Sequence, residues 1–148
     1  MKTNAEGLAL IKSHEGCRLK AYQDVKGVWT IGWGHTGTGV KEGLQWTQKD
    51  ADDALLRDLN NVEAAVTKAL GSGLGAVSVT PNQFSALVSF AYNVGNEAFR
   101  KGTLLRMVLT GQPKAAADEF PRWNRSGGKV VAGLTNRRLD EAALFSKA

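Results

Sequence analysis

HEGCRLKAYQDVKGVWTIGWGH, residues 14–35, decides the fold class, because its pattern changes from helical to extended within a few positions. Leu8, Ile11 and Glu15 follow one another at spacings of three and four, which places them on one face of a helix. Gly16 then provides a helix stop. Glu15 is therefore expected at the C-terminal end of an apolar helix.

The rest of this stretch predicts a β-hairpin. Two runs of β-forming residues, AYQD and VWTIGWGH, flank a turn expected at Lys26-Gly27. Strict alternation would place Thr30, Gly32 and Gly34 on one face, and bulky side chains on the other: Trp29, Ile31, Trp33 and His35. The face that carries Thr30 is then bare, which would let a ligand approach the strand closely.

Capping signals predict helices before and after the hairpin. Thr3 with Glu6, and Thr47 with Asp50, resemble capping boxes. The sequence TPNQ at 80–83 combines a Thr cap, Pro at the first helical position and Gln at the third, and it should open a helix at the centre of the core. Further helical segments are expected at about residues 47–70, 103–110, 113–120 and 135–147.

These elements together predict an α+β fold in a single domain, residues 1–148. A small β-hairpin lobe, about residues 17–46, would pack on a larger helical lobe formed by residues 3–16 and 47–148. We expect the active-site groove between these two lobes.

Composition excludes several classes of protein. Hydrophobic residues make up 43% of the chain and charged residues 22%, as in globular domains. No apolar run is long enough to span a membrane, and the N-terminus lacks the pattern of a secretory signal. The net charge of +5 is concentrated after residue 99, where ten Lys and Arg face four Asp and Glu. A basic segment of this kind suits an anionic partner or simple solubility, and charge alone does not distinguish them.

Glu15, Asp24 and Thr30 are the candidate catalytic residues. The apolar flank and the negative end of the helix dipole both favour the protonated form of the Glu15 carboxyl, as a general acid requires. Asp24, near an exposed turn, should stay ionised, and Thr30 could position a water. Two carboxyl groups in different environments suit glycosidic-bond cleavage. On spacing alone, however, a solvated helix-end Glu and a turn-forming Asp are the favoured interpretation.

Three segments in order resemble the phage lysozymes. The family pattern is Glu, eight residues, Asp or Cys, five residues, then Thr and a glycine-bracketed Gly-His, and Glu15, Asp24, Thr30 and GWGH fit it without a gap. The similarity continues in SFAYNVGNEAFRKGTLLRMVLTG and in RWNRSGGKVVAGLTNRRLDEAALF, so it extends from residue 6 to residue 145.

The resemblance implies a lysozyme-like fold and hydrolysis of the β-1,4 bond between N-acetylmuramic acid and N-acetylglucosamine in bacterial peptidoglycan. The implied reaction is inverting: Glu15 protonates the leaving oxygen, while Asp24 and Thr30 hold the attacking water. It also places Tyr92 and Asn93 along the sugar groove as substrate contacts.

Arg137 and His35 complete the candidate residues. Arg137 and Arg138 are expected at the start of the last helix, where their charge opposes the helix dipole. At least one of them should therefore have an acidic partner, either Glu15 or the peptide carboxylates of the wall. The resemblance favours Arg137 near the catalytic acid and the substrate. We expect His35 to support the hairpin through a hydrogen bond rather than to transfer protons. No cofactor is expected, and no cluster with ligand spacing predicts a metal site.

The resemblance also implies where the enzyme is made and where it acts. The enzyme would be made in the host cytoplasm without a signal peptide, as a monomer with no stable membrane insertion. It would act on the cell wall after membrane permeabilisation by a separate phage protein, a holin.

Three other functions compete with hydrolysis. A lytic transglycosylase needs one acid and neither Asp24 nor Thr30, so their presence argues against it. A non-catalytic wall-binding protein would not need the intact set of three residues. A nucleic-acid binder fits the basic charge, but neither a helix-turn-helix signature nor an interleaved aromatic stripe accompanies it.

Overall fold

The computed structural model describes residues 1–148, which divide into two compact units. Unit 1 comprises Met1–Ile11 and Val62–Ala148, and unit 2 comprises Lys12–Asn61. The division falls inside two helices, α1 (Ala5–Glu15) and α2 (Gln48–Leu70), so each contributes residues to both units. No helix combines the length and the apolar character that crossing a bilayer requires.

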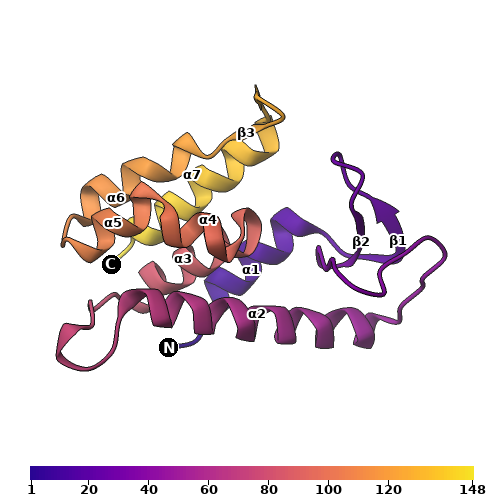
Figure 1. Cartoon of the computed structure of the whole chain (residues 1–148), viewed down its shortest axis with the longest axis horizontal. Coiled ribbons are helices and arrows are strands. Elements are labelled where there is room, and N and C mark those ends of the chain that lie inside the picture. The colour runs from indigo at the N-terminus through magenta and orange to yellow at the C-terminus, as the bar shows by residue number, and fades with distance from the viewer. The chain divides into compact units, whose positions relative to one another are not determined.

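Unit 2 contains the predicted hairpin. Strands β1 (Arg18–Gln23) and β2 (Trp29–Gly32) lie side by side (Figure 1) and pair antiparallel. In this pairing Tyr22 is directly opposite Thr30. The register shifts between Arg18 and Tyr22, as at a β-bulge. The start of α2 adds buried apolar side chains to this unit: Ala51, Ala54, Leu55 and Leu59.

The prediction that one face of β2 is bare is wrong. The strand ends at Gly32, whose φ of 64° turns the chain, so the alternation does not continue to Gly34. The ring of Trp46 and the side chain of Ala51 fill the space beside Gly32. Thr30 itself is only 4% exposed. The alternation rule failed here because a residue beyond the hairpin folds back over it.

Unit 1 is mainly helical. It includes α3 (Pro81–Val94), α4 (Asn96–Lys101), α5 (Thr103–Leu109), α6 (Pro113–Glu119) and α7 (Ala132–Ser146). Short 3₁₀ turns occur at Gly73–Gly75 and Phe120–Arg122, and a two-residue hairpin joins β3 (Arg125–Ser126) to β4 (Lys129–Val130). Neither α4 nor this second hairpin was predicted from the sequence, because both are too short to show periodicity.

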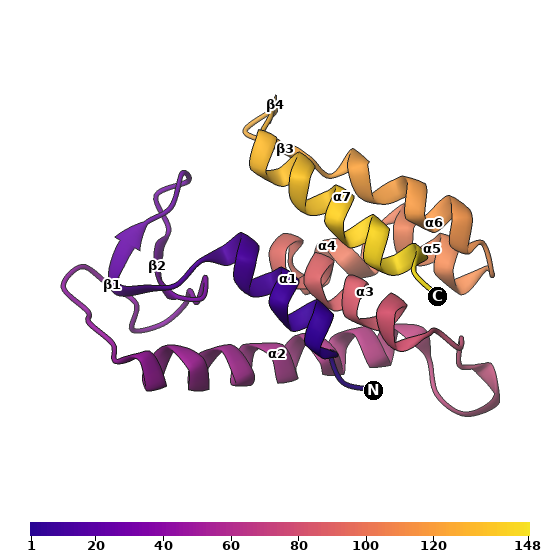
Figure 2. The same cartoon turned by 180° about the vertical axis from the view of Figure 1, so that it is seen from behind.

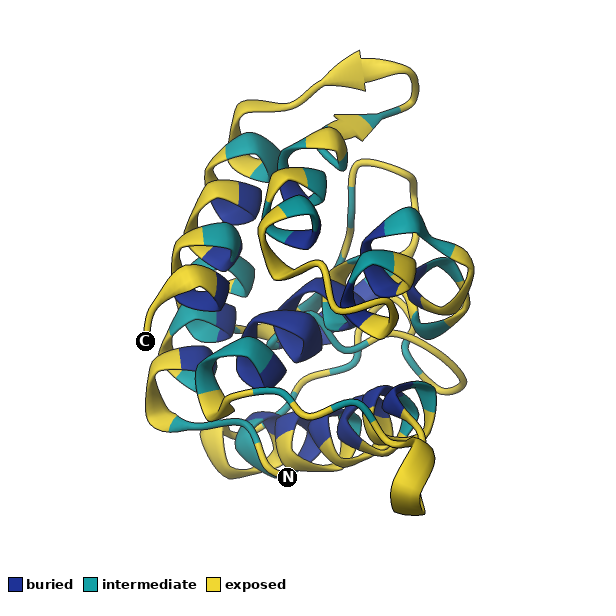
Figure 3. Ribbon diagram, turned by 90° about the vertical axis from the view of Figure 1, so that its left-hand side faces the viewer, coloured by how far each residue is buried: buried dark blue, intermediate teal, exposed yellow.

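Helix α3 forms the centre of the core of unit 1, as predicted. Every residue from 84 to 91 is buried, and α3 lies beside α7 (Figure 2). Figure 3 shows the buried positions in dark blue and the exposed ones in yellow. Phe90 of α3 meets Phe120 and Trp123 edge-on, with both ring centroids at 5.5 Å. Such edge-to-face contacts add to the area buried by the rings.

Two of the three predicted capping boxes are present. The Thr80 hydroxyl accepts from the Gln83 amide at 3.0 Å, and the Gln83 side chain accepts from the Thr80 amide at 2.9 Å. Thr47 and Asp50 exchange the same two bonds at 3.1 Å and 3.0 Å. These side chains satisfy backbone donors that the first helical turn leaves unpaired.

The predicted Thr3 cap of α1 is wrong. Asn4 caps this helix instead: its side-chain Oδ1 accepts from the Gly7 amide at 2.9 Å. The backbone amide and the hydroxyl of Thr3 both donate to Glu63, at 2.5 Å and 2.8 Å. Asn is at least as good a cap as Thr, and a carboxylate from another helix engages the Thr3 donors.

The predicted start of the last helix is also wrong. Helix α7 begins at Ala132, and the Thr135 amide already donates to the Val131 carbonyl at 3.0 Å. Arg137 and Arg138 therefore lie in the helix interior, where the dipole argument does not apply. Both arginines contact Glu141, an acidic residue of the same helix.

Candidate active site

Glu15 is the last residue of α1 and is partly buried. The helix stops as predicted at Gly16, which has a φ of 67° and donates its amide to the Lys12 carbonyl at 3.0 Å. The carboxylate of Glu15 lies against the backbone of Gly34, and a Cβ at that glycine would overlap it. Gly34 also has a φ of 82°. Glycine at this position therefore both makes the turn and leaves room for the acid.

Trp33 joins the turn beside Glu15 to both helices that contribute to unit 2. Its indole N–H donates to Asp52 of α2 at 2.9 Å, and the Lys12 ammonium of α1 lies 5.1 Å from its ring centroid. The hydrogen bonds from Trp33 and then Gln48 hold the pKa of Asp52 below its usual value. Glu15 thus sits beside a turn that is anchored from two sides.

His35 makes the kind of contact that the sequence analysis expected of a supporting residue. Its Nδ1 lies 2.7 Å from a carboxylate oxygen of Asp58, and its ring lies 5.3 Å from that of Trp46. The Asp58 contact fixes the orientation of the imidazole.

Asp24 forms the turn between the two strands. Its Oδ1 accepts from the backbone amides of Lys26 at 2.8 Å and Val28 at 2.9 Å. Gly27, with a φ of 81°, completes the predicted turn. Both backbone donors fall on one carboxylate oxygen, so Oδ2 can accept from another group, such as a water.

The hydroxyl of Thr30 acts as a hydrogen-bond donor within the hairpin. It donates to the Val28 carbonyl at 2.9 Å. A hydroxyl has only one hydrogen, so Oγ1 of Thr30 can only accept from any further partner. With 4% of the residue exposed, access to it is narrow.

Tyr22, which was not among the predicted site residues, adjoins one of them. It lies opposite Thr30 in the hairpin, and the Arg18 guanidinium stacks 4.3 Å from its ring centroid. Burial raises the pKa of the Tyr22 phenol, Arg18 lowers it, and the charges of Glu15 and Asp24 raise it. Both candidate carboxylates therefore act on this one side chain. Its position two residues before Asp24, on the same face of a predicted strand, was the available signal.

Three predicted substrate-binding residues belong to unit 1. Tyr92 is half-buried and Asn93 is exposed, both in the last turn of α3. Arg137 is only 3% exposed, and its guanidinium donates to Glu141 at 3.2 Å and to the Ser89 carbonyl at 3.1 Å. A role for any of them at the sugar stays a prediction, and for Arg137 the burial disfavours direct contact with a glycan.

Glu141 is the centre of a fully buried polar cluster. Arg138 reaches it at 2.7 Å, Arg137 at 3.2 Å, and the Ser89 hydroxyl donates to it at 2.5 Å. Burial raises the pKa of Glu141, and Arg138, Arg137 and the hydrogen bonds oppose that change. Glu141 is thus an acidic partner of both arginines that was not predicted, and a contact of Arg137 with Glu15 stays a prediction.

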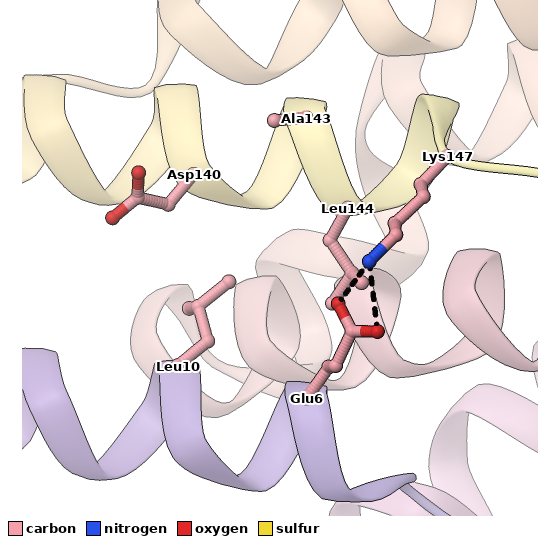
Figure 4. Close-up of a pocket in the computed structure, with 6 residues that line it drawn as sticks. All are labelled: Glu6, Leu10, Asp140, Ala143, Leu144 and Lys147. Atoms are coloured by element: carbon pink, nitrogen blue, oxygen red, sulfur yellow. Dashed lines mark hydrogen bonds and ion pairs between the residues drawn. The ribbon is translucent and has the colours of Figure 1, made fainter.

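A shallow pocket between α1 and α7 contains none of the predicted site residues. Figure 4 shows Glu6 and Lys147 reaching toward each other across it, and their ion pair measures 2.9 Å. Elsewhere in the chain, no group of three or more His, Cys, Asp or Glu side chains is arranged to hold a metal ion.

Comparisons with known proteins place these observations in a family. The model of the family described as Phage lysozyme matches residues 12–141. The endolysin of Bacillus phage PZA is 51% identical over 99% of this chain, although the match covers only 55% of that relative. The endolysin of Salmonella phage P22 is 39% identical over 98% of both chains.

A solved structure, the muramidase domain of SpmX from Asticaccaulis excentricus, superimposes with a TM-score of 0.86. It is 39% identical, and the match covers 99% of each chain. The predicted α+β, lysozyme-like fold is confirmed. The chain spans little more than half the length of several curated relatives that it matches.

Proposed function

The chain belongs to the phage lysozyme family, and on that premise we propose that it hydrolyses the β-1,4 bond between N-acetylmuramic acid and N-acetylglucosamine in bacterial peptidoglycan to lyse a phage host. One observation supports this most directly. Tyr22 lies opposite Thr30 in the hairpin, and the charges of Glu15 and Asp24 both help to raise the pKa of its phenol.

In this proposal, Glu15 is the general acid. Its proton passes to the glycosidic oxygen as the bond from that oxygen to the anomeric carbon breaks. The contact with Gly34 limits the space open to the carboxylate, so that it is already positioned before substrate arrives. The carboxylate of Asp24 stabilises the positive charge that develops on the sugar ring.

Asp24 and Thr30 would hold the attacking water. One water hydrogen is donated to Oδ2 of Asp24, the oxygen that the turn amides leave available, and the other to Oγ1 of Thr30, which can only accept. A lone pair of the water then faces the anomeric carbon. The water oxygen bonds to that carbon and Asp24 takes a proton from it. Asp24 then releases this proton to solvent and Glu15 regains one from solvent, so one water is consumed for each bond cleaved and the configuration inverts.

We also propose that peptidoglycan is the partner and that the protein acts as a monomer. It would reach the wall through a membrane lesion made by a holin. These parts rest on the family relationship.

Replacing the acid tests the proposal. Glu15→Gln should lower the rate of peptidoglycan clearing about a thousandfold, because the amide cannot protonate the leaving oxygen. Its melting temperature should stay near that of the wild type. Glu42→Gln is the matched control, since it removes an exposed acid of the same unit and should keep full activity. Full activity of Glu15→Gln would overturn the proposed mechanism.

The products separate hydrolysis from the transglycosylase alternative. Mass analysis of the released muropeptides should show reducing ends, one water heavier than the anhydro ends that a transglycosylase leaves. Anhydro ends would refute the roles given to Asp24 and Thr30.

A further inference from the structure

Asp52 bonds to the turn that lies against the Glu15 carboxylate. Its Oδ1 accepts from the indole N–H of Trp33 at 2.9 Å and from the side-chain amide of Gln48 at 3.0 Å. Trp33 immediately precedes Gly34, whose backbone adjoins the carboxylate of Glu15. Asp52 therefore holds the turn beside the proposed acid, and all of these residues belong to unit 2.

Gln48 extends this contact to the chain that follows Glu15. An amide NH₂ group has two hydrogens, and that of Gln48 donates both to Asp52 and to Sγ of Cys17, the latter at 3.7 Å. Cys17 comes directly after Gly16, where α1 has ended. Gln48 and Asp52 are four residues apart in α2, so they share one face of that helix. This face of α2 thus bonds to both segments that adjoin the acid, residues 16–17 and residues 33–34.

We propose that Asp52 is a positioning residue for the general acid: by fixing these two segments it keeps the Glu15 carboxyl in one orientation toward the glycosidic oxygen. This inference rests on the proposed function. Gly16 has no side chain, and the space where one would lie is open, so the end of α1 depends on contacts made by the next residue. Asp52 is half-buried, and an ionised acceptor makes both of its hydrogen bonds stronger than a neutral one would.

Asp52→Ala removes the acceptor and should lower kcat about tenfold on soluble peptidoglycan strands, with KM within about twofold of the wild type. The glycan is still bound, but the acid is held less precisely. Asp53→Ala is the matched control, because it removes the neighbouring acid, whose ion pair with Lys49 is exposed, and it should keep kcat. Asp52→Ala with the kcat of the wild type would overturn the inference.

Asp52→Asn separates the hydrogen bonds from the charge. Both donors reach Oδ1, and an asparagine keeps an oxygen acceptor there while losing the negative charge. It should therefore bring kcat back to within about threefold of the wild type. If Asp52→Asn lost as much kcat as Asp52→Ala, the charge and not the positioning contacts would be responsible, and the inference would be wrong.

Trp33→Phe tests the same contact from its other end, and it serves even if Asp52→Ala does not fold. Phenylalanine keeps a ring beside the Lys12 ammonium but has no N–H donor. The kcat should fall several-fold in the wild-type background and by less than about twofold in the Asp52→Ala background, because both changes break one hydrogen bond. An unchanged kcat of Trp33→Phe, or losses that multiply in the double variant, would contradict the positioning role.

Glu15→Gln distinguishes a failure of this inference from a failure of the proposed function. If the wild type did not cleave the strands, or if Glu15→Gln kept full activity, the proposed function or its acid would be refuted. If the wild type cleaves, Glu15→Gln does not, and Asp52→Ala keeps its kcat, only the positioning role of Asp52 is refuted.

Discussion

Glu15 in unit 2 and Glu141 in unit 1 are both acids held in polar clusters, but different forces hold them. Glu15 is partly exposed and lies against the backbone of Gly34, in a turn that Trp33 anchors. Asp24, the other candidate acid of this unit, accepts from backbone amides. Glu141 is fully buried and surrounded by two arginines and a serine. Glu15 therefore keeps some exposure to solvent, whereas the carboxylate of Glu141 is buried against charged and polar groups.

The difference follows from solvation. A carboxylate that must exchange protons with substrate and solvent needs access, and the missing side chain at Gly34 leaves room for that of Glu15. A fully buried carboxylate without counter-charges would cost several kcal/mol. Glu141 therefore requires its arginines, while Glu15 requires the absence of a side chain at Gly34.

The largest expected effect on stability comes from Glu141→Gln. It leaves Arg137 and Arg138 buried without their shared carboxylate, which should cost about 3–5 kcal/mol of the free energy of unfolding. The melting temperature should fall by about 10 °C in a calorimetric scan. Glu97→Gln, which removes an exposed acid paired with Lys101, should change stability by less than about 0.5 kcal/mol. Equal effects of the two variants would remove the contrast between the clusters.

Gly34→Ala should have the next largest effect, this time on activity. The new methyl group overlaps the Glu15 carboxylate and must displace it, so clearing of peptidoglycan should fall about a hundredfold. The positive φ adds a strain of about 1–2 kcal/mol. Gly43→Ala is a matched control, because its φ is 88° and nothing lies near the added methyl. It should lose similar stability and keep activity; a comparable loss of activity would show that strain alone explains Gly34→Ala.

The smallest expected effect is a change in the titration of Tyr22. The charges of Glu15 and Asp24 help to raise the pKa of its phenol, because a nearby negative charge disfavours the phenolate. Glu15→Gln and Asp24→Asn should therefore each lower this pKa, and the ultraviolet signal of ionisation should appear at lower pH. Tyr92, the other tyrosine, serves as an internal reference, and Glu42→Gln as a control. No change in the Glu15 or Asp24 variant would place that carboxylate away from Tyr22.

Much of the fold was predictable because local rules agreed with one another. The capping boxes at Thr47 and Thr80, the stop at Gly16 and the turn at Asp24 each depend on residues within a few positions, and all are present. Local rules failed where a distant residue competed. Glu63 bonds Thr3 in place of a helix cap, and Trp46 covers the strand face that alternation left bare.

The candidate site shows the same division. Glu15, Asp24 and Thr30 were identified by resemblance and spacing, since a family pattern is written in the order of the chain. Tyr22 was not predicted because spacing in the sequence did not indicate its pairing with Thr30 or the effect of Glu15 and Asp24 on the pKa of its phenol. The roles of Tyr92, Asn93 and Arg137 at the sugar stay predictions.

The sequence by itself determined the helices, the hairpin and the family pattern of acids, because caps, turns and periodicity act over a few residues and need no knowledge of the rest of the chain. Only the tertiary structure decided that Arg138 and Arg137 share Glu141 and that Gly34 makes room for Glu15. Those outcomes depend on which buried charges meet and on where a carboxylate meets the backbone of another segment. Both are set by packing between segments far apart in the chain.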